Sequence, residues 1–114
     1  MVSKNTNPVL AVTCDRFGRV EQVLRDDAGI TAGVEPGAPF HIMTARDSAQ
    51  KALRFLEALR ESGAVSNWEL VVEFEEDLKT FHFSGGTPGG KLLIVGSLAP
   101  GELEGQFQEM MRIC

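Results

Sequence analysis

Residues 85–91, with the sequence GGTPGGK, have the spacing of a phosphate-binding loop: a glycine, four residues, a second glycine and a lysine. In such a loop, backbone N–H groups and the lysine bind the phosphates, and a Ser or Thr directly after the lysine binds Mg²⁺. That position is Leu92 here. A phosphate loop also leads into a helix, whereas the apolar run from Leu92 to Val95 indicates a buried strand. We therefore interpret the segment as a hairpin connection whose glycines supply positive φ, and we expect it to bind no nucleotide.

The two histidines, His41 and His82, are the candidate axial ligands if the chain binds haem. His41 lies where a helical segment is expected to start, which is a suitable position for a pocket. His82 alternates out of phase with Phe81 and Phe83, so we expect it to face away from the core. No cofactor is predicted from these residues. Haem and a small organic ligand stay open as alternatives.

The remaining reactive side chains predict neither a catalytic residue nor a metal site. Cys14 and Cys114 are the two cysteines and form no C-x-x-C pair, so a disulfide framework is not expected and Cys14 is interpreted as a core thiol. The acidic run at residues 75–77 (Glu-Glu-Asp) is interpreted as a polar turn. Ser, His and Asp are not grouped along the sequence, and no compact set of metal ligands occurs.

Composition points to one globular domain. The chain has 114 residues, 43% of them hydrophobic, a net charge of −5 and a pI of about 5.0. No basic patch stands out, so nucleic acid is not an expected partner. The sequence has no signal peptide and no stretch that could span a bilayer, which leads us to expect a cytoplasmic location.

The pattern of apolar residues predicts five strands around one interior helix. Two strands, at residues 9–14 and 19–25, form a hairpin, and residues 26–40 are a broken connection that turns Ile30, Val34 and Phe40 inward. The helix begins at Asp47 or Ser48 as its cap and ends at Gly63. Its apolar face is expected to comprise Ala49, Ala52, Leu53, Phe55, Leu56 and Leu59.

Three further strands follow the helix, at residues 68–74, 79–84 and 91–98. Four aromatic side chains could line a ligand pocket, but their periodicity favours core packing for each: Phe40, Phe55, Trp68 and Phe83.

This order of elements resembles a PAS domain: a hairpin, a broken helical connection, a long helix, a three-stranded meander and an exit helix. The stretch CDRFGRVEQV is similar to the opening hairpin of that family. KALRFLEALRESGAVSNWELVVE is similar to its long helix and third strand, and KLLIVGSLAPGELEGQFQEMMR to its last strand and signalling helix. The resemblance implies an α/β (α+β) fold with a five-stranded antiparallel sheet and flanking helices. The flavin-linked Asn-Cys-Arg motif of some PAS photosensors is absent.

Residues 99–114 are expected to form the exit helix, after a lead-in at residues 1–8 and a PAS-like domain at residues 9–98. Four apolar residues in this helix have coiled-coil spacing: Leu103, Phe107, Met110 and Cys114. They are the candidate interface of a homodimer. The alternative is that this seam folds back on the sheet of its own chain.

The resemblance implies a cytoplasmic sensory domain that is itself non-catalytic. PAS domains with such an exit helix are often the input and dimerisation module of a bacterial histidine kinase, so a downstream kinase domain in the same chain and a small-molecule ligand are the implied partners. The alternative is a free-standing ligand-binding or scaffold protein. An enzyme of unknown type is the third interpretation.

Overall fold

The computed structural model describes residues 8–74 and 76–98. In these ranges the elements are β1 (Val9–Cys14), β2 (Val20–Asp26), the 3₁₀-helices η2 (Phe40–Met43) and η3 (Arg46–Ser48), α1 (Ala49–Ser62), β3 (Ala64–Phe74), β4 (Asp77–Gly86), the short η4 (Pro88–Gly90) and β5 (Leu92–Leu98). No helix in the described ranges is long and apolar enough to cross a membrane. The predicted exit helix and its seam lie outside them, so these features and the domain boundaries stay predictions.

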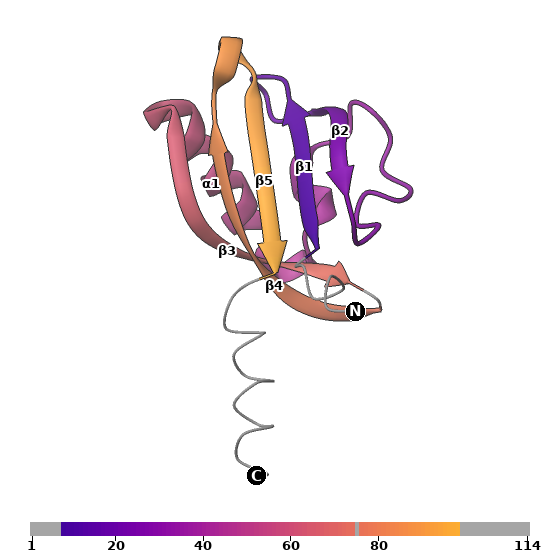
Figure 1. Ribbon diagram of the computed structural model, residues 1–114. Coiled ribbons are helices and arrows are strands. Elements are labelled where there is room, and N and C mark those ends of the chain that lie inside the picture. The colour runs from indigo at the N-terminus through magenta and orange to yellow at the C-terminus, as the bar shows by residue number, and fades with distance from the viewer. Residues whose placement is uncertain (1–7, 75, 99–114) are drawn as a thin grey trace, which may run out of the picture.

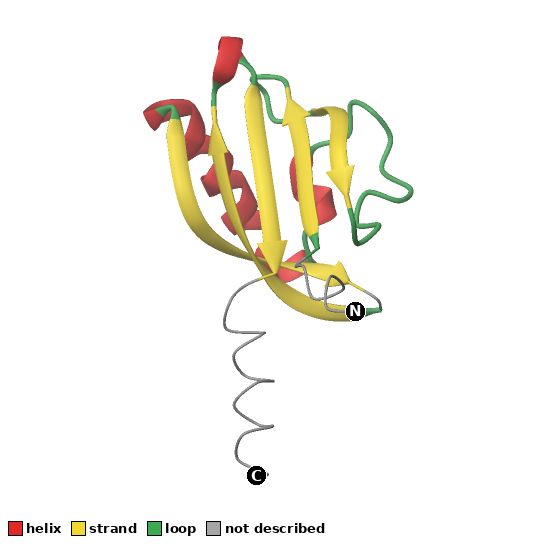
Figure 2. Ribbon diagram, in the orientation of Figure 1, coloured by secondary structure: helices red, strands yellow, loops and turns green. Residues whose placement is uncertain are grey.

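The strands form one antiparallel sheet in the order β2-β1-β5-β4-β3. The first and last strands pair at its centre, where Val12 lies opposite Ile94. Figure 1 shows α1 behind one face of the sheet, and Figure 2 shows the same two layers coloured by type of element. The α+β fold with a five-stranded antiparallel sheet, predicted from the order of elements, is confirmed.

The core lies between the sheet and α1 and is built around phenylalanine rings. Phe40, Phe55, Phe81 and Phe83 are all 0% exposed. The centroid of the Phe83 ring lies 5.7 Å from that of Phe40, 6.3 Å from that of Phe55 and 6.2 Å from that of Phe81. Trp68 is partly buried at the margin, with its ring 5.7 Å from Phe55. These contacts confirm core packing for the four aromatic residues singled out in the sequence.

Gly96 gives the Phe83 ring the room it occupies. The two residues are paired across β4 and β5. A Cβ atom at Gly96 would lie 2.4 Å from Cε1 of Phe83, well inside van der Waals contact. Because Gly96 on the central strand β5 has no side chain, the Phe83 ring can occupy its position in the core.

The helix α1 begins and ends where predicted, but its N-terminus has no side-chain capping bond. Gly63 adopts φ 83° and its N–H donates to the carbonyl of Leu59, which confirms the left-handed C-terminal cap. Ser48 holds the cap position, yet its hydroxyl makes no capping bond and instead accepts a hydrogen bond from the Val71 N–H at 2.9 Å. Leu53, expected on the buried face, is 47% exposed because it lies beyond the edge of the buried stripe formed by Ala52, Phe55, Leu56 and Leu59.

The glycine-rich segment connects β4 to β5, so the hairpin interpretation is confirmed. Gly85 and Gly86 belong to β4 and pair with Ile94 and Leu93, which shortens the connection to residues 87–91. Gly89 and Gly90 adopt φ of 62° and 83°. No helix follows, because Leu92 starts a strand.

Strand β2 shows no regular alternation of buried and exposed side chains. Its pairing with β1 shifts twice, between Ala11 and Val12 and between Thr13 and Cys14, and each shift inserts an unpaired residue into β2. Only Val20 of this strand is buried, while Val23 and Leu24 are 43% and 51% exposed. The bulges turn the side chains out of the two-residue period that the sequence suggests.

Both outer strands have neighbours along part of their free edges. Along β2, the Val20 N–H donates to the Ala38 carbonyl at 2.8 Å, and the Gly37 N–H donates to the Val20 carbonyl at 2.7 Å. Along β3, the Ala45 N–H donates to the Val71 carbonyl at 2.7 Å, next to the Ser48 contact described above. The segment before η2 therefore runs along part of the free edge of β2, and the segment after η2 runs along part of the free edge of β3.

Cys14 is the buried core thiol that the sequence suggests. Its side chain is 0% exposed. Burial, followed by the charges of Asp15 and Glu21, raises the pKa of the thiol to about 12. Because the thiolate is the reactive form, this cysteine is expected to be inert in the folded protein.

Candidate ligand-binding site

A groove of about 680 Å³ opens beside the core, between three segments that are distant in sequence. Residues 28–34 after β2 form one wall, residues 42–47 form the second, and Glu73, Glu76 and Leu78 of the β3–β4 hairpin form the third. In Figure 1 the connection after β2 and the tip of this hairpin lie on the same side of the molecule. A volume of this size is in the range of small-molecule sites.

The inner part of the groove is apolar and continuous with the core. Met43 is buried, and Ile30 and Val34 are partly buried against the core cluster. Toward the opening, Ile42 is 51% exposed and Leu78 is 60% exposed. Two large apolar side chains exposed within one concave site offer surface that a bound apolar molecule would remove from water.

The rim of the groove is charged. Arg46 and Asp47 belong to η3, while Glu73 lies at the end of β3 and Glu76 in the turn that follows. All four are exposed, and none forms an ion pair with another residue in the described ranges. The carboxylates among them outnumber the single guanidinium by three to one. The rim therefore has a net negative charge, and no ion pair within the described ranges competes with a ligand for its charged side chains.

Asp26 holds the wall after β2 in shape. Its carboxylate accepts hydrogen bonds from the Ile30 N–H at 2.9 Å, the Thr31 N–H at 2.7 Å and the Thr31 hydroxyl at 2.6 Å. These bonds close a turn that contains the lining residues Ala28, Gly29 and Ile30. The second wall is held by the bonds between residues 45–48 and β3 described above. Both walls are thus held by hydrogen bonds within the protein.

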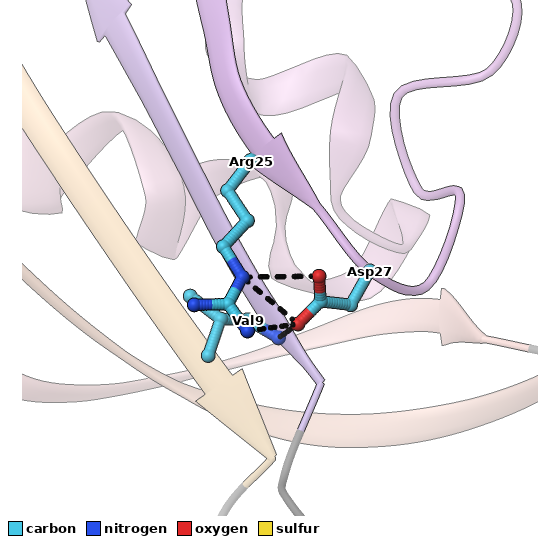
Figure 3. Close-up of polar contacts among 3 residues, drawn as sticks. All are labelled: Val9, Arg25 and Asp27. Atoms are coloured by element: carbon cyan, nitrogen blue, oxygen red, sulfur yellow. Dashed lines mark hydrogen bonds and ion pairs between the residues drawn. The ribbon is translucent and has the colours of Figure 1, made fainter.

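The base of the first wall is fastened by an ion pair at the end of β2. Figure 3 shows the Asp27 carboxylate accepting hydrogen bonds from the Arg25 side chain at 3.0 Å and from the Val9 N–H at 3.0 Å. The hydrogen bond from Arg25, and after it that from Val9, lowers the pKa of the Asp27 carboxyl below its ordinary value. This contact ties the start of β1 to the point where the loop leaves the sheet.

Asp27→Asn is expected to destabilise the fold slightly at neutral pH, in a pH-dependent way. The folded-state pKa of Asp27 is lowered, so its contribution is present above the ordinary pKa of 3.8 and is lost as the pH falls through the lowered value. The melting temperatures of wild type and variant should therefore differ at neutral pH and converge in strong acid. Circular dichroism melts over this range measure the difference, with Glu61→Gln on α1 as the control for net charge. A difference that persists unchanged in strong acid would contradict the assignment.

The structure does not bring the two histidines together. His41 lies on η2 next to the groove residue Ile42 but does not line the groove, and its Nδ1 is buried without a hydrogen-bond partner in the described ranges. His82 faces away from the core, as predicted, with Nε2 3.1 Å from the Glu69 carboxylate. Among residues 8–74 and 76–98, no three His, Cys, Asp or Glu side chains form a group that could hold a metal ion.

The groove itself was missed by sequence reasoning. Glu76 falls in the predicted acidic turn, where it adopts φ 62°, but nothing in the pattern links that turn to Asp47. The alternation of β3 predicts only that Glu73 is exposed. The usable signal was the unusually broken connection at residues 26–40 ahead of the helix, which forms one wall.

The chain is similar in fold to solved PAS domains. It matches the PAS domain of the RpfR quorum-sensing receptor of Cronobacter turicensis in complex with BDSF, at a TM-score of 0.62 and 15% identity, over 86% of this chain and 98% of the other. The same domain in complex with C12:0 matches at a TM-score of 0.62 and 15% identity, over 88% and 99% of the two chains. No family model matches the sequence. No curated protein matches it either. The fold is therefore PAS-like.

Proposed function

We propose that this chain is a sensory domain of the PAS type, which binds a small, mainly apolar organic molecule in the groove. The observation that carries the proposal is the groove itself, whose walls are held by hydrogen bonds and which exposes Ile42 and Leu78 toward its opening. The solved PAS domains with BDSF and C12:0 support ligand binding by this fold. At 15% identity they transfer no residue of their sites to this chain.

The finer proposal is that the domain is the cytoplasmic input and dimerisation module of a histidine kinase, with the kinase domain in the same chain. This proposal is supported by the connection that β5 makes between the core and the predicted exit helix. β5 is paired on both sides, with β1 and β4, and its last residue, Leu98, packs against the core cluster. A change in the core can therefore reach residue 98, directly before the predicted exit helix.

Ile42→Glu is expected to weaken the binding of a neutral apolar probe, Nile red, by about tenfold or more. A buried large apolar side chain contributes about 1.5–3 kcal/mol, and the variant replaces that contact with a charge. Probe fluorescence during titration measures the affinity. Leu53→Glu is the matched control, because Leu53 is similarly exposed at 47% but lies on α1 outside the groove. Equal losses in both variants, or no binding by wild type, would contradict the proposed site.

Phe107→Glu is expected to shift the chain from dimer to monomer. The proposed seam, Leu103, Phe107, Met110 and Cys114, would bury Phe107 in both copies, so the dissociation constant should rise by about tenfold or more. Sedimentation velocity measures the change, and the far-ultraviolet spectrum should stay the same. Gln108→Glu adds the same charge outside the seam and serves as control. A variant that stays dimeric, or that unfolds, contradicts the seam, and a monomeric wild type favours a free-standing ligand-binding protein.

A further inference from the structure

We infer that the ligand of the groove is an amphipathic cation, with an apolar body and an ammonium-type group. This inference rests on the proposed function, since it specifies the chemistry of the molecule that the groove takes. It is argued from the charge and the position of the rim residues. The two solved neighbours hold BDSF and C12:0, so the inference separates this chain from them.

The rim places negative charge on two of the three walls of the groove. Asp47 projects from η3, and Glu73 and Glu76 belong to the β3–β4 hairpin. With Arg46 as the single cation in the lining, the formal balance is three negative charges against one positive, or −2. The rest of the chain has the same sign, because the whole chain carries a net charge of −5, of which the lining accounts for −2. A cation in the groove is therefore attracted by the acidic residues of two walls.

An anionic ligand would be poorly matched. A carboxylate in the groove would have Arg46 as its only cationic partner in the lining, and Asp47 follows Arg46 directly in sequence. The glutamates of the hairpin would add to this repulsion. Like charges at close quarters raise the free energy of the bound state, and a partly apolar wall increases the effect.

The rim also favours an organic cation over a metal ion. Asp47, Glu73 and Glu76 do not form one of the close groups of ligands that a metal needs, none of which occurs in the described part of the chain. The same lining presents apolar side chains, with Met43 buried and Ile42 and Leu78 exposed toward the opening. A diffuse positive group on an apolar body satisfies both features, since the body covers the exposed side chains while the cation remains at the wet rim.

The experiment compares three ligands of equal chain length: decyltrimethylammonium, decanol and decanoate. Each is titrated below its micelle concentration, at low salt and neutral pH, by competition with Nile red. We expect the cation to bind about threefold to tenfold more tightly than the alcohol, and the carboxylate to bind more weakly than the alcohol. Added salt should reduce the difference, because it screens exposed charges. Far-ultraviolet circular dichroism at each endpoint verifies that the protein stays folded.

Variants assign the effect to the rim. The double variant Glu73→Gln/Glu76→Gln should weaken the binding of the cation by about threefold to tenfold and leave the affinity for decanol unchanged. Arg46→Gln should strengthen cation binding. The matched control is Glu57→Gln/Glu61→Gln, which removes the same net charge from exposed positions of α1 outside the groove. This control separates a local contact from the general field of an acidic protein.

The outcomes distinguish the inference from the proposed function. If decanol or decanoate binds as tightly as the cation, the inference is wrong and the groove remains a site for apolar molecules. If the rim variant and the control variant weaken the binding of the cation equally, the assignment of the effect to the rim carboxylates is also wrong. If none of the three ligands displaces Nile red, the proposed function fails together with the inference.

Discussion

Phe83→Ala is expected to lower the free energy of unfolding by about 3–5 kcal/mol, the range for removing a large aromatic side chain from a packed core. Phe83 is 0% exposed and its ring meets Phe40 edge-on at a centroid distance of 5.7 Å, with Phe55 and Phe81 close by. Alanine would leave a cavity at the point where these rings meet. The surrounding rings come from β4, α1 and η2, so they cannot all move in to fill it.

Urea unfolding followed by circular dichroism measures this loss. Phe17→Ala is the matched control, because it removes the same atoms from a side chain that is 71% exposed in the turn between β1 and β2. The control should change the stability by less than about 0.5 kcal/mol. If Phe83→Ala costs no more than Phe17→Ala, the aromatic cluster does not stabilise the fold in the way described.

Gly96→Ala is expected to destabilise the protein by about 1–3 kcal/mol, although it adds only a methyl group. The new Cβ atom would lie 2.4 Å from Phe83 Cε1. The ring cannot yield freely, because Phe40, Phe55 and Phe81 surround it. Gly86→Ala is the control on the neighbouring strand: the nearest atom to a Cβ there is the Gly63 carbonyl oxygen at 4.0 Å. Its cost should be much smaller.

A double variant tests whether the cost comes from this one contact. In the Phe83→Leu background the smaller, flexible side chain can move away, so Gly96→Ala should cost less there than in wild type. Chemical denaturation of the four proteins gives the coupling energy, expected at about 0.5–3 kcal/mol. Independent, additive effects of the two substitutions would show that the packing between Gly96 and Phe83 is not the cause.

The sequence predicts the fold well where the determinants are local or periodic. The run from Val9 to Cys14 gives β1 with its bounds, and Gly63 ends α1 because few other residues adopt its backbone conformation so readily. Alternation places Phe81 and Phe83 inward and His82 outward, as observed. Each of these features depends on residues that are close in sequence.

The groove could not be predicted, because it depends on contacts between distant segments. Asp47 and Glu73 line the same groove because residues 44–48 return along the edge of β3, with the Ser48 hydroxyl used there instead of at the helix start. The pattern offers Asp47 or Ser48 as the helix cap, and Ser48 holds that position, but its hydroxyl binds β3 instead of the helix start. The bulges in β2 are a second example, since the pairing with β1 shifts twice and the order of residues in the strand does not indicate these shifts.

The covered edges of the sheet have a consequence for the behaviour of the protein at high concentration. An open edge strand presents unpaired N–H and C=O groups to any passing chain and can seed fibrils or strand-swapped aggregates. Here Gly37 and Ala38 occupy part of the edge of β2, and Ala45 and Ser48 occupy part of the edge of β3. Copies of the domain that meet in a crowded solution are therefore hindered from pairing their sheets at these positions of the two edges.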